Sequence, residues 1–131
     1  MKVLYAGDTL PATVWSCLES DQKSYLVDVR TEQEWSTVGI PDLSSIDKKL
    51  ILLSWKMLPD MVVNHMFTKL LQIEVPDLSS HIFFICRSGV RSKEAAKEAA
   101  ANGYINSYNV IDGFEGSANG WVSSNLPKRF Y

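Results

Sequence analysis

The chain has 131 residues, with 13 Lys and Arg against 15 Asp and Glu and a formal net charge of −2 at pH 7. Hydrophobic residues make up 46% of it and charged residues 21%, which is typical of a globular domain. The length suits one domain over residues 1–131, and the near-neutral charge argues against a nucleic-acid binder. No apolar run approaches the roughly 20 residues that a membrane-spanning helix needs, so we expect no membrane association.

The chain has two cysteines, Cys17 and Cys86, which lie far apart in dissimilar surroundings. The N-terminal apolar stretch is too short for a signal peptide and meets Asp8 at once. We therefore expect a cytoplasmic protein with free thiols rather than a disulfide. Cys17 lies on or beside a helix-period apolar stripe, which favours a packing role over a reactive one.

The first apolar run, over residues 2–5, predicts a strand at the edge of a sheet. A helix should follow it, because Asp8 or Thr9 can act as the N-cap and Pro11 fits a first helical turn. The apolar stripe of this helix ends near Asp21.

The rest of the chain continues to alternate strands and helices. After a strand over 25–29, Thr31 and Glu34 form a capping box, which predicts a short helix through Trp35. Further strands are predicted over 49–53, 82–85 and 108–111, and helices over 60–73, 92–101 and 114–121. The alternation predicts an α/β fold with a central, mainly parallel β-sheet of about five strands flanked by helices on both faces.

Cys86 ends a continuously apolar strand and is followed by a short polar loop and a helix beginning near Ser92. Ligands bind at this carboxyl end of the strands in open parallel sheets. A tight turn here, with Gly89 in a left-handed conformation, can direct backbone N–H groups at an anion. The helix N-terminus and the charges of Arg87 and Arg91 add to this field. The segment therefore predicts a cysteine whose thiolate is stabilised and nucleophilic at neutral pH.

Residues 86–92, Cys-Arg-Ser-Gly-Val-Arg-Ser, resemble the active-site loop of the rhodanese (thiosulfate sulfurtransferase) family. The resemblance covers nearly the whole chain. It also rests on Asp28-Val29-Arg30 with Glu34, on Gly39-Ile40-Pro41, and on Gly113, Trp121 and Pro127 near the end of the chain.

The resemblance implies a rhodanese-like fold and a sulfurtransferase that works by a ping-pong reaction. Cys86 would take a sulfane sulfur from thiosulfate or a persulfide donor and pass it, as a persulfide, to cyanide, a thiol or a protein acceptor. No metal or organic cofactor is implied, and we expect a monomer. The substrate-binding loop would consist of Arg87, Ser88, Gly89, Val90, Arg91 and Ser92.

Within this loop the resemblance implies distinct roles. Arg87 and Arg91 would attract the anionic donor, with Arg91 turned inward to brace the loop as a second option. Ser88 and Ser92 would donate hydrogen bonds, and Ser92 would also cap the following helix.

Residues outside the loop are expected to support it. Asp28 and Arg30 would form an ion-pair or hydrogen-bond network beside it. Trp35 and Trp121 are expected to pack in the core or at the rim.

Two segments depart from the family pattern. The His that usually precedes Ile40-Pro41 is absent, and Asp42 stands where Gly is usual. The closing Gly-Gly is replaced by the longer segment 112–116. Because this rim shapes access to the cysteine in the family, substrate preference cannot be inferred from it.

Two alternatives remain open. A Cys-dependent phosphatase or arsenate reductase also uses a Cys–loop–Arg cradle, but such phosphatases have a longer loop than the four residues between Cys86 and Arg91. The other alternative is a non-catalytic rhodanese-like module that binds proteins or senses redox state, because a reactive thiol also suits a sensor.

Overall fold

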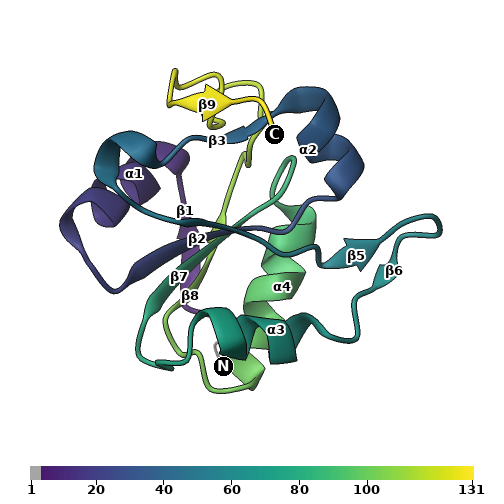
Figure 1. Cartoon of the computed structure of the whole chain (residues 1–131). Coiled ribbons are helices and arrows are strands. Elements are labelled where there is room, and N and C mark those ends of the chain that lie inside the picture. The colour runs from purple at the N-terminus through teal and green to yellow at the C-terminus, as the bar shows by residue number, and fades with distance from the viewer. Residues whose placement is uncertain (1–3) are drawn as a thin grey trace.

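A five-stranded parallel sheet forms the centre of the computed structural model, which describes residues 4–131 (Figure 1). The strand order is β1-β8-β7-β2-β4, and all four pairings are parallel. These strands are β1 (Gly7–Thr9), β2 (Ser24–Asp28), β4 (Leu50–Leu52), β7 (His81–Ile85) and β8 (Ser107–Val110). The predicted fold class is thus confirmed, and β7, which leads to Cys86, is the middle strand.

Helices cover both faces of the sheet. They are α1 (Pro11–Ser20), α2 (Glu32–Val38), α3 (Phe67–Glu74) and α4 (Val90–Ala101), with a short 3-10 turn, η1, at Ser44–Ile46. Side chains alternate along β7, so that Phe84 packs with α3 and α4 while Phe83 packs with α1. Each face has its own buried apolar cluster, which explains why β7 is apolar throughout.

Two small antiparallel sheets lie outside the central one. β3 (Ile40–Pro41) pairs with β9 (Lys128–Arg129) and ties the chain end to the segment after α2. β5 (Lys56–Met57) and β6 (Val62–Val63) form a hairpin that projects from the body of the molecule (Figure 1). Among residues 4–131, no helix combines the length and apolar character needed to cross a membrane.

The start of the chain differs from the prediction. The edge strand is Gly7–Thr9 rather than 2–5; residues 4 and 5 are not in a strand, and residues 2 and 3 lie outside the described part. Leu10, not Asp8 or Thr9, is the N-cap of α1. The physical reason is that Asp8 and Thr9 pair with β8, and the Asp8 carboxylate accepts hydrogen bonds from Tyr5 and Asn109 instead of capping the helix.

The predicted helix over 60–73 is wrong in its first half, because Val62 and Val63 form strand β6 and only Phe67–Glu74 is helical. Asn64 explains the change of structure. Its backbone N–H donates to the Trp55 carbonyl at 2.8 Å, and its side chain donates to the Ser54 carbonyl at 3.1 Å. These bonds hold the chain in a hairpin, and helical periodicity alone did not reveal them.

The predicted helix over 114–121 is also wrong, because this segment is a series of turns. Its first two backbone N–H groups bond to the cysteine loop: Phe114 N–H donates to the Cys86 carbonyl at 2.8 Å and Glu115 N–H to the Arg87 carbonyl at 3.0 Å. Gly113, at φ 52°, permits this approach, since a Cβ there would overlap the Cys86 carbonyl. The segment therefore serves as a clamp on the cysteine loop.

Candidate active site

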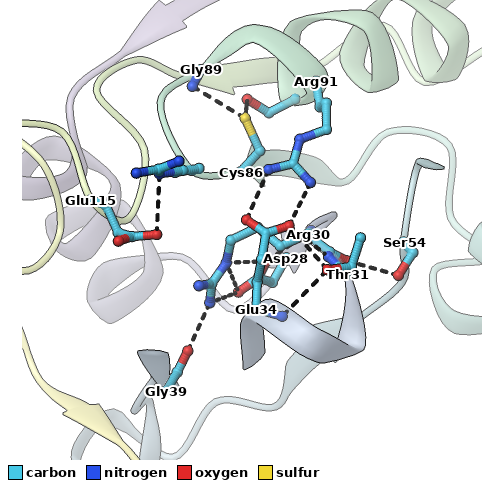
Figure 2. Close-up of polar contacts among 12 residues, drawn as sticks. Asp28, Arg30, Thr31, Glu34, Gly39, Ser54, Cys86, Gly89, Arg91 and Glu115 are labelled. Carbon is cyan, nitrogen blue, oxygen red and sulfur yellow. Dashed lines mark hydrogen bonds and ion pairs between the residues drawn. The ribbon is translucent and has the colours of Figure 1, made fainter. Parts of the chain in front are cut away.

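The Cys86 side chain lies at the carboxyl end of β7, inside the turn that leads to α4. It is 1% exposed, and the Gly89 N–H donates to its Sγ at 3.1 Å (Figure 2). Gly89 is the N-cap of α4 and has φ 108°, a conformation that residues with a Cβ rarely adopt. The loop thus aims a backbone donor and a helix N-terminus at the sulfur, as the sequence predicts.

Ser92 occupies a different place from the predicted one. Because α4 begins at Val90, Ser92 is inside the first turn and does not cap the helix. Its hydroxyl is fully buried, lies 3.2 Å from Cys86 Sγ, and donates to Asn109 Oδ1 at 2.6 Å. The side chain therefore points back to the sheet, under the sulfur. Sequence reasoning missed Asn109; an amide side chain within the strand predicted over 108–111 was its only signal.

Arg91 turns away from solvent and pairs with Glu34 from α2. Its two terminal nitrogens donate to the two carboxylate oxygens at 2.7 and 2.9 Å (Figure 2). Glu34 also completes the predicted capping box with Thr31, which the structure confirms. This bidentate pair braces the start of α4 against α2. The link between Glu34 and Arg91 was not predicted.

The Arg91–Glu34 pair perturbs the acidity of both groups. The hydrogen bonds that Arg91 donates to Glu34 raise the pKa of Arg91 above its ordinary value, despite the opposing effect of burial. Partial burial alone would raise the pKa of Glu34, but the hydrogen bonds from Arg91 and Thr31 outweigh it and lower that pKa below its ordinary value. Both side chains are therefore charged at neutral pH.

Arg87 stays at the surface. Its side chain is 67% exposed, and its Nε lies 3.5 Å from the Glu115 carboxylate. Arg87 and Glu115 form one side of a cavity of about 310 Å³ beside the loop, and Gln33, Glu34, Thr37 and Val38 form the other. Ser88 and Val90 are also exposed. The loop thus has a solvent-facing side, made of Arg87, Ser88 and Val90, and a buried side, made of Cys86 and Ser92.

Asp28 and Arg30 form a fully buried ion pair beneath the loop. Arg30 donates to the Asp28 carboxylate at 2.7 Å and to the Gly39 carbonyl at 2.9 Å (Figure 2). The Arg30 guanidinium also lies 4.1 Å from the centre of the Phe114 ring. The pair joins the end of β2 to the 39–46 segment and to the 114–121 clamp.

The remaining candidate residues lie away from the sulfur. Trp121 is fully buried against Trp15, and Trp35 packs on Tyr131. Cys17 is half-buried on α1, and neither cysteine is in a disulfide. Within residues 4–131, no cluster of His, Cys, Asp and Glu could hold a metal ion.

A cysteine in a short loop at the tip of the middle strand of a parallel α/β sheet defines a rhodanese-like domain. The chain belongs to this family: the family described as the STR4 middle domain matches residues 7–130. The crystal structure of Rv0390 from M. tuberculosis is similar, with a TM-score of 0.87 and 40% identity over 95% of this chain and 98% of that one.

Two curated relatives are similar to this chain over most of its length. An uncharacterized protein of Rickettsia conorii is 43% identical over 118 residues, which are 88% of this chain and 91% of that protein. The thiosulfate:glutathione sulfurtransferase of Saccharomyces cerevisiae is 36% identical over 105 residues, 79% of this chain and 68% of that protein.

Proposed function

We propose that the protein is a sulfurtransferase that carries a sulfane sulfur on Cys86 as a persulfide. The observation that carries the proposal is the position of Cys86 Sγ, held at the strand end by the Gly89 N–H and beside the N-terminus of α4. A persulfide is anionic at its outer sulfur, and this environment suits an anion of one atom. The name of the yeast relative is consistent with such chemistry.

In the first half-reaction Cys86 attacks the outer sulfur of thiosulfate. A new S–S bond forms while the bond between the outer sulfur and the sulfonate group breaks. Cys86–SH and S₂O₃²⁻ thus give Cys86–S–S⁻ and HSO₃⁻, so the bonding electrons and the thiol proton leave with sulfite. A persulfide donor R–S–SH reacts in the same way and leaves as the thiol R–SH.

In the second half-reaction an acceptor attacks the outer sulfur of the persulfide. Cyanide gives thiocyanate, a thiolate R–S⁻ gives R–S–S⁻, and Cys86 returns as a thiolate that takes up a proton. Because the sulfur is held covalently between the two steps, the donor leaves before the acceptor binds. No metal or organic cofactor takes part in either step.

The charged residues in and beneath the loop have two kinds of role: one attracts the sulfur donor and the others support the loop. Arg87, at the surface, would guide an anionic donor to the loop. Arg91 would support the loop rather than contact the donor, because both of its terminal nitrogens donate hydrogen bonds to Glu34. Asp28 and Arg30 would hold the floor of the loop.

Loop length separates this proposal from phosphatase or arsenate reductase activity. Four residues lie between Cys86 and Arg91, and Arg91 is turned toward Glu34 rather than toward the space around the sulfur. A phosphoryl group needs a wider ring of donors with an arginine pointing into it. The arrangement therefore suits a single sulfur atom better than a tetrahedral phosphate.

The mass of the intact protein after incubation with thiosulfate tests the proposal. We expect a gain of one sulfur atom that cyanide removes. Cys86→Ala should abolish the gain, whereas the matched variant Cys17→Ala should keep it, because Cys17 lies on α1 away from the loop. No gain with thiosulfate or with a glutathione persulfide would refute the enzyme and favour the binding or redox-sensing module.

A further inference from the structure

A line of hydrogen bonds runs from Cys86, through the buried side chains of Ser92 and Asn109, to Asp8, an exposed residue on the edge strand. Cys86 Sγ lies 3.2 Å from Ser92 Oγ, and Ser92 donates to Asn109 Oδ1 at 2.6 Å. Asn109 Nδ2 in turn donates to Asp8 Oδ1 at 3.1 Å. The line crosses the face of the sheet that is otherwise covered by the apolar cluster of α3 and α4. Buried polar groups of this kind need a reason, because apolar side chains would fill the space at lower cost.

The direction of each hydrogen bond in this line is fixed by chemistry. An ionised carboxylate only accepts, so Asp8 requires the NH₂ end of the Asn109 amide. The amide oxygen of Asn109 then faces Ser92 and requires its hydroxyl proton. Ser92 has one such proton, so the side of Oγ that faces Cys86 carries lone pairs and can only accept.

We propose that Asp8 is a positioning residue for Cys86. Acting through Asn109, it turns the Ser92 hydroxyl away from the sulfur, so that Ser92 accepts the proton of the resting Cys86 thiol. The thiol proton, which leaves with sulfite in the proposed first half-reaction, is thus held on the Ser92 side, while the Gly89 N–H contacts the sulfur from the loop side. Ser92 is thus a hydrogen-bond donor, as predicted, but its donated bond goes to Asn109 and not to the sulfur.

Other charged groups lie near Cys86 and near Asp8, and their influence on the Cys86 thiol must be separated from that of the hydrogen-bond line. Those from the elements around Cys86 are Arg87 with Glu115, Arg91 with Glu34, and the buried pair Asp28–Arg30. Near Asp8, Tyr5 donates to the same carboxylate oxygen at 2.9 Å, and Lys93 lies 5.9 Å from the centre of the Tyr5 ring. Removing the Asp8 charge would by itself favour a thiolate, so a test needs a background in which only the hydrogen-bond line is broken.

The test uses four proteins in a Cys17→Ala background: the parent, Asp8→Ala, Ser92→Ala and the double variant. The measured quantity is the rate of Cys86 alkylation by iodoacetamide as a function of pH, with near-UV circular dichroism as the check of folding. This readout rests on Cys86 being the nucleophile but needs no sulfur transfer, so its failure is separate from failure of the persulfide experiment.

We expect each single variant to move the curve of alkylation rate against pH to lower pH. On the acidic side of that curve, Cys86 should be alkylated about three- to tenfold faster than in the parent. The double variant should lie much closer to Ser92→Ala than Asp8→Ala lies to the parent, because Asp8 acts mainly through Ser92. Slower alkylation of Ser92→Ala would make Ser92 a donor and overturn the proposal. So would an Asp8→Ala effect as large in the Ser92→Ala background as in the parent, because that would be a charge effect that does not pass through Ser92. If Ser92→Ala does not fold, Asn109→Leu removes the acceptor of the Ser92 proton and should shift the profile in the same direction; an unchanged profile would overturn the proposal.

Discussion

Glu34→Gln removes the charge that holds Arg91 while keeping nearly the same side-chain shape. The pair is 15% and 22% exposed, and it has two short hydrogen bonds of 2.7 and 2.9 Å. Hydrogen bonds to charged groups contribute about 1.5–3 kcal/mol each, and breaking a fully buried pair costs about 3–5 kcal/mol. Because Gln can keep one of the two bonds and the pair is partly solvated, we expect the free energy of unfolding to fall by about 2 kcal/mol at neutral pH.

The pH dependence of this loss follows from the lowered pKa of Glu34. A carboxyl whose pKa is lower in the folded state contributes stability that is fully present above its unfolded value, here 4.5. That contribution is lost as the pH falls through the folded-state value. The difference between the wild type and Glu34→Gln should therefore be constant above pH 4.5 and shrink below it.

Urea unfolding followed by circular dichroism, repeated across this pH range, measures the difference. Glu74→Gln is the matched control, because Glu74 pairs with Lys49 at 2.9 Å but the two side chains are 37% and 73% exposed. That control should change the free energy of unfolding by less than about 1 kcal/mol. An equal effect of the two substitutions, or a Glu34→Gln loss that does not shrink in acid, would refute the reasoning.

Three further substitutions test the neighbouring parts of the site. Arg87→Ala should raise KM for thiosulfate about tenfold and leave KM for an uncharged persulfide donor nearly unchanged; equal effects in steady-state assays would contradict a guiding role for this charge. Gly113→Ala should lower the free energy of unfolding by more than about 2 kcal/mol, because its Cβ would overlap the Cys86 carbonyl; a wild-type melting curve would contradict the clamp. Arg30→Met should cost about 3–5 kcal/mol, because it leaves the Asp28 carboxylate buried and unpaired; a loss below about 1 kcal/mol in urea unfolding would show that the pair does not support the loop.

Local signals in the sequence identify the features that depend on neighbouring residues. The capping box of Thr31 and Glu34, the apolar strand before Cys86 and the glycine in the following turn each depend on a few adjacent residues, and all are present as predicted. The parallel direction of the strands follows from the alternation of strands and helices and from the rules for parallel connections.

Features that depend on distant partners were missed. The helix predicted over 60–73 gives way to a hairpin because Asn64 bonds to Ser54 and Trp55, which no periodicity reveals. The partners of the loop come from equally distant segments: Arg91 and Glu34 are 57 residues apart, and Asn109 and Asp8 are 101 residues apart. Sequence patterns locate the cysteine at the strand end, but the groups that orient its neighbours are set by the tertiary fold.

The charges around the loop are more balanced than the sequence suggests. Arg30, Arg91 and Arg87 each face a carboxylate, from Asp28, Glu34 and Glu115 respectively. The first two pairs are buried or nearly so, and their charges cancel at short range. The third is the longest, at 3.5 Å, and its arginine is 67% exposed, so it is the pair most weakened by water and salt. Arg87 is therefore the one of these three arginines that an anionic donor can most readily draw from its carboxylate. At the sulfur itself, the groups left to stabilise an anion are the Gly89 N–H and the N-terminus of α4, which act only over short distances.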